Sequence, residues 1–367
     1  MTNSSSQRLL SLDLLRGVTI IFMIIVNDPG SWDHVYAPLL HAEWNGITPT
    51  DYIFPNFLFI VGVSIVLSVG KQIDNGKSKS EILKKIILRS IKIYLVGLLL
   101  WLIPDFDFSN IRWTGVLQRI SIVFLFCALI YLYTSWKTQV YISIAVLLLY
   151  WIIMAYVPIP GIGYPDLSVP EKNWAHYIDA LYLPGVLWQK TWDPEGILST
   201  LPSIITGVIG MLFGYIITIK KNINDKLILI FVFGFILLFI GDSFRWLFPV
   251  NKNILSTSYT LLMGGISSLT LGFSIYLIDV LKYSKGLNFA QVFGVNSIFS
   301  YALAGVLTII FYSKDLLGFS LSQNFVSKWS EIGMDPKLGS FIYAILYVII
   351  IWIPTYYLYK RKIFIKL

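Results

Sequence analysis

Long hydrophobic segments alternate with shorter polar segments along nearly the whole chain. Each hydrophobic segment is apolar over roughly 18 residues or more, enough helix to cross about 30 Å of hydrocarbon. The expected spans are 9–27, 52–70, 87–103, 115–134, 140–157, 197–218, 227–247, 256–281, 288–312 and 339–358. Backbone groups in lipid must bond within their own segment, so the pattern predicts an all-α polytopic transmembrane helix bundle of about ten helices.

Composition and charge agree with a membrane protein. Hydrophobic residues make up 56% of the chain and charged residues 13%, and the mean hydropathy is +0.72. The net charge of +8 comes from short basic clusters between the apolar segments rather than from one soluble face. We therefore expect a lipid environment and no nucleic-acid partner.

The distribution of basic residues predicts an orientation. Lysine and arginine gather in alternate connecting segments such as 71–92 and 220–226, whereas the long connections 28–51, 158–196 and 313–338 hold few. The positive-inside rule then places both termini in the cytoplasm (N-in/C-in) and these long connections outside. No small-residue cleavage site follows the first span, so we expect it to be retained. Because no shift in composition divides the chain, we predict that residues 1–367 form a single transmembrane domain.

The first outer connection holds two of the three histidines, His34 and His41. A histidine is the natural general base near neutral pH, although His41 on its own fits a hydrogen-bonded loop or interface histidine better than a catalytic one. The possible metal ligands here are Asp28, Asp33, His34, His41 and Glu43. Their spacing matches no recognised zinc or calcium pattern, so no metal site is predicted.

Several polar residues lie within or beside the expected spans. Asp13 and Arg16 are three residues apart and can pair on one helix face. Arg119 has no acidic residue within a helical turn, so it needs a partner elsewhere in the bundle or an anionic ligand. With Asn296, these residues are candidates to line a polar path through the membrane.

Two short outer segments have alternative interpretations. Asp193 and Glu195 precede the span 197–218, where carboxylates can cap a helix or bind sugar hydroxyls and an ammonium group. Asn251 and Lys252 lie in a segment with the composition of a turn, which could also bind phosphates or sugars.

Seven blocks, in order along the chain, resemble the heparan-α-glucosaminide N-acetyltransferase family of transmembrane acyltransferases. The blocks are LSLDLLRG at 10–17, VN at 26–27, HAEWNGITPTDYIFP at 41–55, GVLQRI at 115–120, DPEGIL at 193–198, PVNKN at 249–253 and GVNSI at 294–298. The resemblance implies an enzyme that transfers acetyl from acetyl-CoA to the amine of a glucosamine-type sugar. It also implies that His41 and Asn27 are catalytic.

The same resemblance guides the expected binding residues. We expect Arg16, Arg119, Asn251, Lys252 and Asn296 to bind acetyl-CoA, and Asn45, Asp51, Asp193 and Glu195 to bind the acceptor. Lysosomal members carry a luminal domain before the matched region, so the expected acceptor is an amino sugar or a short oligosaccharide. The expected location is the inner (cytoplasmic) membrane of a bacterium.

Other functions and routes stay open from the sequence. An amino-sugar permease would also need many spans and a few buried polar groups, and an O-acyltransferase of a cell-envelope glycan would use a hydroxyl acceptor. Within the acetyltransferase, His41 could act as a base or carry the acetyl group itself. A homodimer is a further open alternative.

Overall fold

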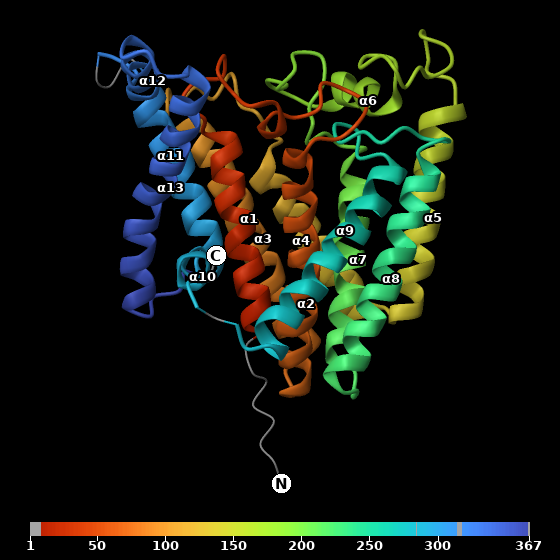
Figure 1. Ribbon diagram of the computed structural model, residues 1–367. Coiled ribbons are helices and arrows are strands. Elements are labelled where there is room, and N and C mark those ends of the chain that lie inside the picture. Colours follow the sequence, from red (N-terminus) through yellow and green to blue (C-terminus); the bar gives the residue numbers. More distant parts are fainter. Residues whose placement is uncertain (1–8, 284, 314–317, 366–367) are drawn as a thin grey trace. The chain divides into compact units, whose positions relative to one another are not determined.

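The computed structural model describes residues 9–283, 285–313 and 318–365 (Figure 1). Within these ranges every named element is a helix, so the expected all-α helical class is confirmed. The residues form two compact units: the first contains the described parts of Met1–Tyr36, Asn222–Phe231 and Leu269–Lys366, and the second Ala37–Lys221 and Val232–Ser268. The boundary falls within α8 (Ile223–Phe244) and α9 (Thr257–Ile275). Whether the chain acts as one domain remains a prediction.

In the first unit, α1 (Leu10–Asn27) packs closely on α10 (Asn288–Val295). A Cβ atom at Gly17 would lie 1.8 Å from the Ala290 carbonyl oxygen, so this contact requires glycine. Arg16 Nη1 lies 3.3 Å from Asp13 Oδ1, which confirms the predicted pair, and it also donates to the Gly294 carbonyl at 3.1 Å. The remaining helices of this unit are α11 (Ser297–Tyr312), α12 (Leu321–Glu331), α13 (Pro336–Lys360) and the short π-helix Tyr276–Val280.

The predicted span 288–312 is broken into two helices. The chain bends by 88° between α10 and α11, at Asn296. Asn296 Nδ2 donates to the Ile363 carbonyl at 3.1 Å, and its Oδ1 accepts the Ile365 N–H at 2.9 Å. The side chain thus bonds backbone groups of the C-terminal segment at the break between the two helices.

The second unit is built around α2 (Ile53–Asp74) and α7 (Thr200–Thr218), which lie side by side. A Cβ atom at Gly210 would lie 2.0 Å from the Phe59 carbonyl oxygen, so glycine permits this close approach. Around them lie α3 (Lys79–Leu102), α4 (Val116–Tyr133), α5 (Trp136–Tyr156) and α6 (Trp174–Tyr182), with two short 3₁₀ turns at Ala37–Leu39 and Pro49–Tyr52.

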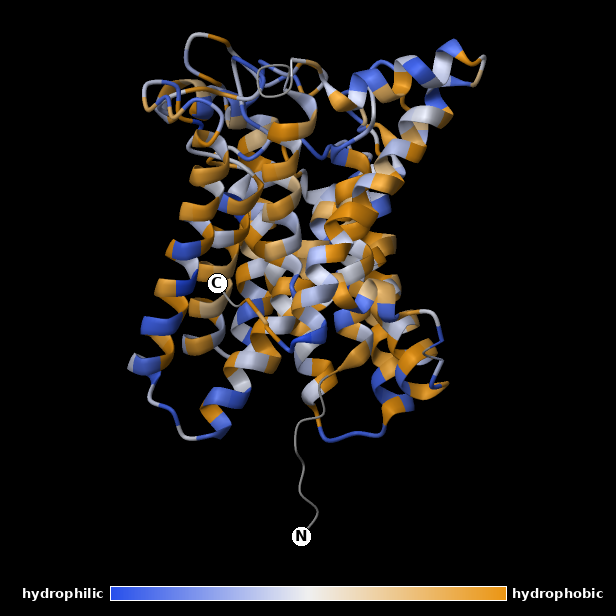
Figure 2. Cartoon of the chain, turned by 90° about the vertical axis from the view of Figure 1, so that its left-hand side faces the viewer, coloured by the Kyte–Doolittle hydropathy of each residue, from blue (hydrophilic) through white to orange (hydrophobic). Residues whose placement is uncertain are grey.

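In the described part of the chain, eight helices are long and apolar enough to span a membrane, or nine if the bent pair α10–α11 counts as one span. The expected number was about ten. The difference arises at α3, whose first four turns carry several lysines, a glutamate and an arginine, and at the broken pair. Figure 2 shows hydrophobic residues along most of the helix lengths and hydrophilic residues toward the connecting segments. The cytoplasmic placement of the termini remains a prediction.

Candidate functional site

The turn that precedes α2 is organised by a buried carboxylate. Asp51, only 1% exposed, accepts the Thr48 N–H on Oδ2 at 2.8 Å, as expected for a helix start with threonine at the cap and an acidic residue three positions on. The Tyr259 hydroxyl, from α9, donates to the Asp51 backbone carbonyl at 2.6 Å. The carboxylate is therefore held in a fixed position.

The imidazole of His41 lies against this carboxylate. Nδ1 is 2.7 Å from Asp51 Oδ1, and the neighbouring Ala42 N–H donates to Oδ2 at 3.2 Å. Because an ionised carboxylate can only accept, Nδ1 donates and Nε2 is left as the acceptor nitrogen. The His41 side chain is 44% exposed. The ring can therefore meet an outside ligand while its orientation is fixed from within.

Lys252 adds a cation to the same group. Its Nζ is 3.0 Å from His41 Nε2, 2.9 Å from Nδ1 and 3.8 Å from Asp51 Oδ1. Burial lowers the pKa of Lys252, while the negative charges of Asp51 and Glu195 act in the opposite direction. The imidazole thus lies between the Asp51 carboxylate and the Lys252 ammonium group.

The segment that carries Lys252 is fixed to the segment that carries His41. Asn251 is fully buried and donates from Nδ2 to Asn45 Oδ1 at 3.1 Å, and the Gly46 N–H donates to the Val250 carbonyl at 2.8 Å. Gly46 has a φ of +105°, in the region that favours glycine. Backbone and side-chain bonds therefore set the position of the lysine relative to the histidine.

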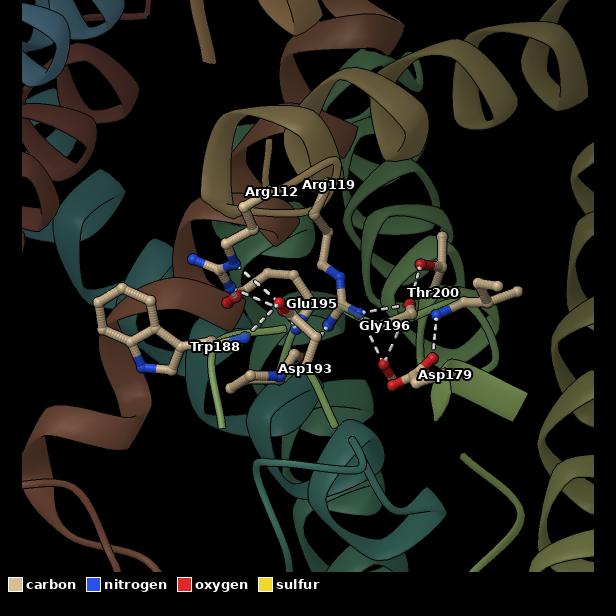
Figure 3. Close-up of polar contacts among 11 residues, drawn as sticks. Arg112, Arg119, Asp179, Trp188, Asp193, Glu195, Gly196 and Thr200 are labelled. Atoms are coloured by element: carbon tan, nitrogen blue, oxygen red, sulfur yellow. Dashed lines mark hydrogen bonds and ion pairs between the residues drawn. The ribbon is translucent and has the colours of Figure 1, made fainter. Parts of the chain in front are cut away.

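A second charged cluster lies before α7 in the same unit (Figure 3). Arg112 binds Asp193 through two hydrogen bonds of 2.7 Å and Glu195 through a third of 2.7 Å, and its guanidinium lies 4.8 Å from the Trp188 ring centre. Burial tends to raise the pKa of Asp193, but Arg112 holds it below its ordinary value. Such a bidentate pair orders the connection that contains 193–195.

Arg119 has its partners inside the protein. Its guanidinium donates to the Pro194 carbonyl at 2.9 Å, the Gly196 carbonyl at 2.9 Å and Ser199 Oγ at 2.6 Å, and the residue is 2% exposed. Of the two alternatives that the sequence left open, the structure shows the internal partner. Arg119 therefore fixes the turn at 194–199 (Figure 3).

The structure brings many predicted site residues together in the second unit. One group consists of His41, Asn45, Asp51, Asn251 and Lys252. The Arg112 cluster contains Arg119, Asp193 and Glu195. The two groups adjoin one another, because the charge of Glu195 acts on Lys252. The predicted residues Asn27, Arg16 and Asn296 belong to the other unit, where Asn27 is the exposed last residue of α1. The individual roles of all these residues remain predictions.

Sequence reasoning missed two features of this region. Asp51 was assigned to the acceptor, but both of its oxygens are engaged by His41, Ala42 and Thr48. Arg112 was not singled out, although three acidic oxygens depend on it. The Thr48-x-x-Asp51 spacing could have indicated the first, whereas nothing local to Arg112 indicates partners 81 residues away. In the described ranges no group of three or more His, Cys, Asp or Glu is placed to hold a metal ion.

Comparison with known proteins points to one family. A family model described as heparan-alpha-glucosaminide N-acetyltransferase, catalytic, matches residues 8–243. The mouse (Mus musculus) heparan-alpha-glucosaminide N-acetyltransferase is 26% identical over 99% of this chain and 61% of its own length. The human (Homo sapiens) protein of the same name is 28% identical over 98% of this chain and 60% of its own length. The chain thus spans about three fifths of the length of these curated relatives.

Proposed function

Because the chain belongs to the heparan-alpha-glucosaminide N-acetyltransferase catalytic family, we propose that it is an integral-membrane acetyltransferase with His41 as the general base. The donor is acetyl-CoA and the acceptor is the amine of a glucosamine-type sugar. The observation that carries the proposal is the 2.7 Å pairing of a half-exposed His41 imidazole with the buried Asp51 carboxylate. This pairing engages Nδ1 and leaves Nε2, which lies 3.0 Å from Lys252 Nζ, as the nitrogen that can accept a proton.

The chemistry requires a base because a sugar ammonium cannot attack a thioester. His41 Nε2 removes one proton from the ammonium, and the neutral amine nitrogen forms a bond to the acetyl carbon. The C–S bond then breaks, and the acylated nitrogen loses its second proton to the departing CoA thiolate. Asp51 stabilises the imidazolium that forms and keeps Nδ1 as the donor. Lys252 Nζ lies 3.0 Å from Nε2, so the lysine must move away from this nitrogen when the amine approaches it.

Asn27 supplies the second proposed catalytic group. A side-chain amide N–H can stabilise the negative oxygen of the tetrahedral intermediate, and removal of such a donor typically lowers the rate about 10²–10³-fold. The family resemblance at 26–27 and the exposure of Asn27 support this assignment. The alternative chemistry, an acetyl-His41 intermediate, predicts a labelled acetyl-protein in the absence of sugar, and the direct route predicts none.

The structure refines the proposed acceptor contacts. Asp193 is 1% exposed and bonds Arg112 with both oxygens, so we assign it to ordering the connection rather than to direct contact with sugar. Glu195 retains some exposure and acts electrostatically on Lys252. We therefore assign acceptor contact to Glu195 and Asn45.

We place the protein in a bacterial inner membrane, with His41 on the outer side, from the distribution of basic residues. Acetyl-CoA is cytoplasmic, so the acetyl group must cross. In sealed right-side-out vesicles, acetyl-CoA loaded inside should support acetylation of an impermeant amino sugar outside. Activity only when donor and acceptor share a compartment would contradict this placement but not the acetyltransferase activity.

The decisive experiment is incubation of the purified protein with labelled acetyl-CoA and a panel of amino sugars, each paired with its hydroxyl counterpart. We expect label on the amine of at least one amino sugar with the parent protein and none with His41→Ala. Transfer to the hydroxyl counterparts alone would indicate an O-acyltransferase. Sugar binding without CoA binding would indicate a permease.

A further inference from the structure

Helix α3 has one buried face and one exposed face along its length. The buried residues Ile82, Ile86, Ser90, Ile93 and Gly97 recur at steps of three and four and pack toward α4. Ser90 Oγ lies 2.8 Å from Ser121 Oγ of α4, which fixes this face inward.

The other face carries an exposed apolar stripe, whose members are Leu88, Ile91, Leu95 and Leu99. Each is half exposed or more, and the steps of three and four place them in one row on the helix. An exposed apolar row of this length on a helix of a membrane protein is a surface for lipid chains.

Charged residues adjoin the N-terminal end of this stripe. We call three exposed lysines the lysine cluster: Lys77, Lys84 and Lys85. Beside them is a cavity of about 380 Å³, which is lined by Glu81, Lys84, Lys85 and Leu88. Lys85 is close enough to Lys77 to lower the pKa of Lys77, while the negative charge of Glu81 acts in the opposite direction. Among the described residues, no carboxylate lies within ion-pair distance of these three lysines.

Two ammonium groups that approach one another repel unless an anion lies between them. Inner connections of membrane proteins are rich in lysine for topological reasons alone. Topology does not, however, require that Lys77 and Lys85 approach one another beside a cavity, or that Leu88 of the apolar stripe should line that cavity. The arrangement fits a ligand that is anionic at one end and apolar along the rest.

We propose that the lysine cluster binds the phosphate headgroup of an anionic phospholipid whose acyl chains lie along the apolar stripe of α3. Lysine ammonium groups attract anionic lipid by about 1 kcal/mol each near a membrane surface. A nucleotide or inorganic phosphate would satisfy the lysines but would leave the adjoining stripe without an apolar partner. The site is independent of the acetyltransferase proposal, since none of its residues belongs to the His41 or Arg112 clusters.

The test measures lipid retained by the purified protein in native mass spectrometry, with equal amounts of phosphatidylglycerol and phosphatidylcholine in the detergent. The parent should retain phosphatidylglycerol preferentially. The double variant Lys84→Gln/Lys85→Gln should lose this preference by about tenfold or more. The matched control is Lys220→Gln/Lys221→Gln, which removes the same charge from another exposed lysine pair in the same unit and should behave as the parent.

A third variant tests the apolar half of the site. Leu88→Ser should weaken phosphatidylglycerol retention while leaving all the lysines in place. Equal loss in the two double variants would overturn the proposal, as would equal retention of the two lipids by the parent. Displacement of phosphatidylglycerol by millimolar inorganic phosphate or by a nucleotide would also overturn it, because the site would then recognise phosphate without the lipid. Thermal unfolding of each variant verifies that the exposed substitutions leave the fold intact.

Discussion

His41 and His176 lie in the same unit but in opposite surroundings. His41 is half exposed, with the Asp51 carboxylate at 2.7 Å and the Lys252 ammonium at 3.0 Å. His176 is 3% exposed, and its ring stacks on Trp192 with centres 4.2 Å apart. In the described part of the chain its Nε2 has no hydrogen-bond partner. One ring is surrounded by charge and the other by aromatic surface.

The difference shows what distinguishes a base from a packing residue. Burial lowers the pKa of His176 to about 3, so this ring cannot gain a proton near neutral pH. The carboxylate beside His41 provides the charge that an imidazolium needs, and the exposure provides access. In the sequence both residues are histidines in predicted outer connections. Only the folded surroundings of each ring distinguish the proposed base from the packing residue.

The largest expected effect is the loss of acetyl transfer in His41→Ala. General base catalysis contributes about 10²–10⁴-fold, and His41 is the group proposed to remove the proton from the sugar ammonium. Acetyl transfer to the amino sugar, measured with saturating donor, should be undetectable. His176→Phe is the matched control and should retain activity within about threefold, because the buried His176 ring stays neutral near pH 7. If His41→Ala turned over nearly as fast as the parent, His41 would not be the general base, and the comparison with His176 would lose its basis.

Asp51→Asn should lower kcat about 10²–10³-fold with little change in the KM for either substrate. An amide at this position no longer stabilises the imidazolium and can orient the ring in the wrong tautomer. Asp51→Glu, which keeps the charge, should recover part of the rate. If Asp51→Asn only raised the KM for the acceptor, Asp51 would be a substrate-binding residue, as the sequence first suggested.

The sequence predicts the helical class, the family and the block containing His41, because apolar length and local motifs are properties of adjacent residues. It does not predict the pairing of Arg112 with Asp193, since these residues are 81 positions apart and meet only through folding. It also counts α10–α11 as one span, because hydropathy records apolar length and not the 88° bend at Asn296. The interpretation of Arg119 required its carbonyl partners, which no residue pattern encodes.

Glu195→Gln should have a smaller effect on acetyl transfer than the two preceding variants. It tests how much the charged surroundings of His41, as opposed to the aromatic surroundings of His176, contribute to catalysis. Glu195 acts on Lys252 and bonds Arg112, so its neutral form should raise the acceptor KM about threefold to tenfold and leave the acetyl-CoA KM unchanged. Asp193→Asn is the informative partner variant. It breaks a buried ion pair and should lower the melting temperature, since such losses cost about 3–5 kcal/mol. An unchanged acceptor KM in Glu195→Gln would return that residue to a purely structural role.

The last expected effect concerns stability rather than activity, and it is the pH dependence that α6 contributes through His176 and Asp179. The folded pKa of His176, about 3, lies below its unfolded value of 6.5, so the stability associated with the neutral ring is complete above pH 6.5 and is lost as the pH falls. Burial raises the pKa of Asp179 to about 7, above its ordinary 3.8, so its contribution has the opposite sign and grows as the pH falls from 7. In the parent the two slopes oppose one another between about pH 4 and 6.5.

Single variants should separate the contributions of His176 and Asp179 to the pH dependence of the free energy of unfolding. Between pH 7 and pH 5, His176→Phe should gain about 2 kcal/mol relative to the parent, and Asp179→Asn should lose a similar amount, which corresponds to shifts of a few degrees in melting temperature. Each result is expressed as the stability of the variant minus that of the parent at the same pH, so that the contributions of the other titrating groups cancel. His34→Phe, in the other unit, should follow the parent throughout. Parallel pH profiles for His176→Phe and the parent would show that His176 gains its proton as easily when folded as when unfolded, and the contrast with His41 would then have no electrostatic basis.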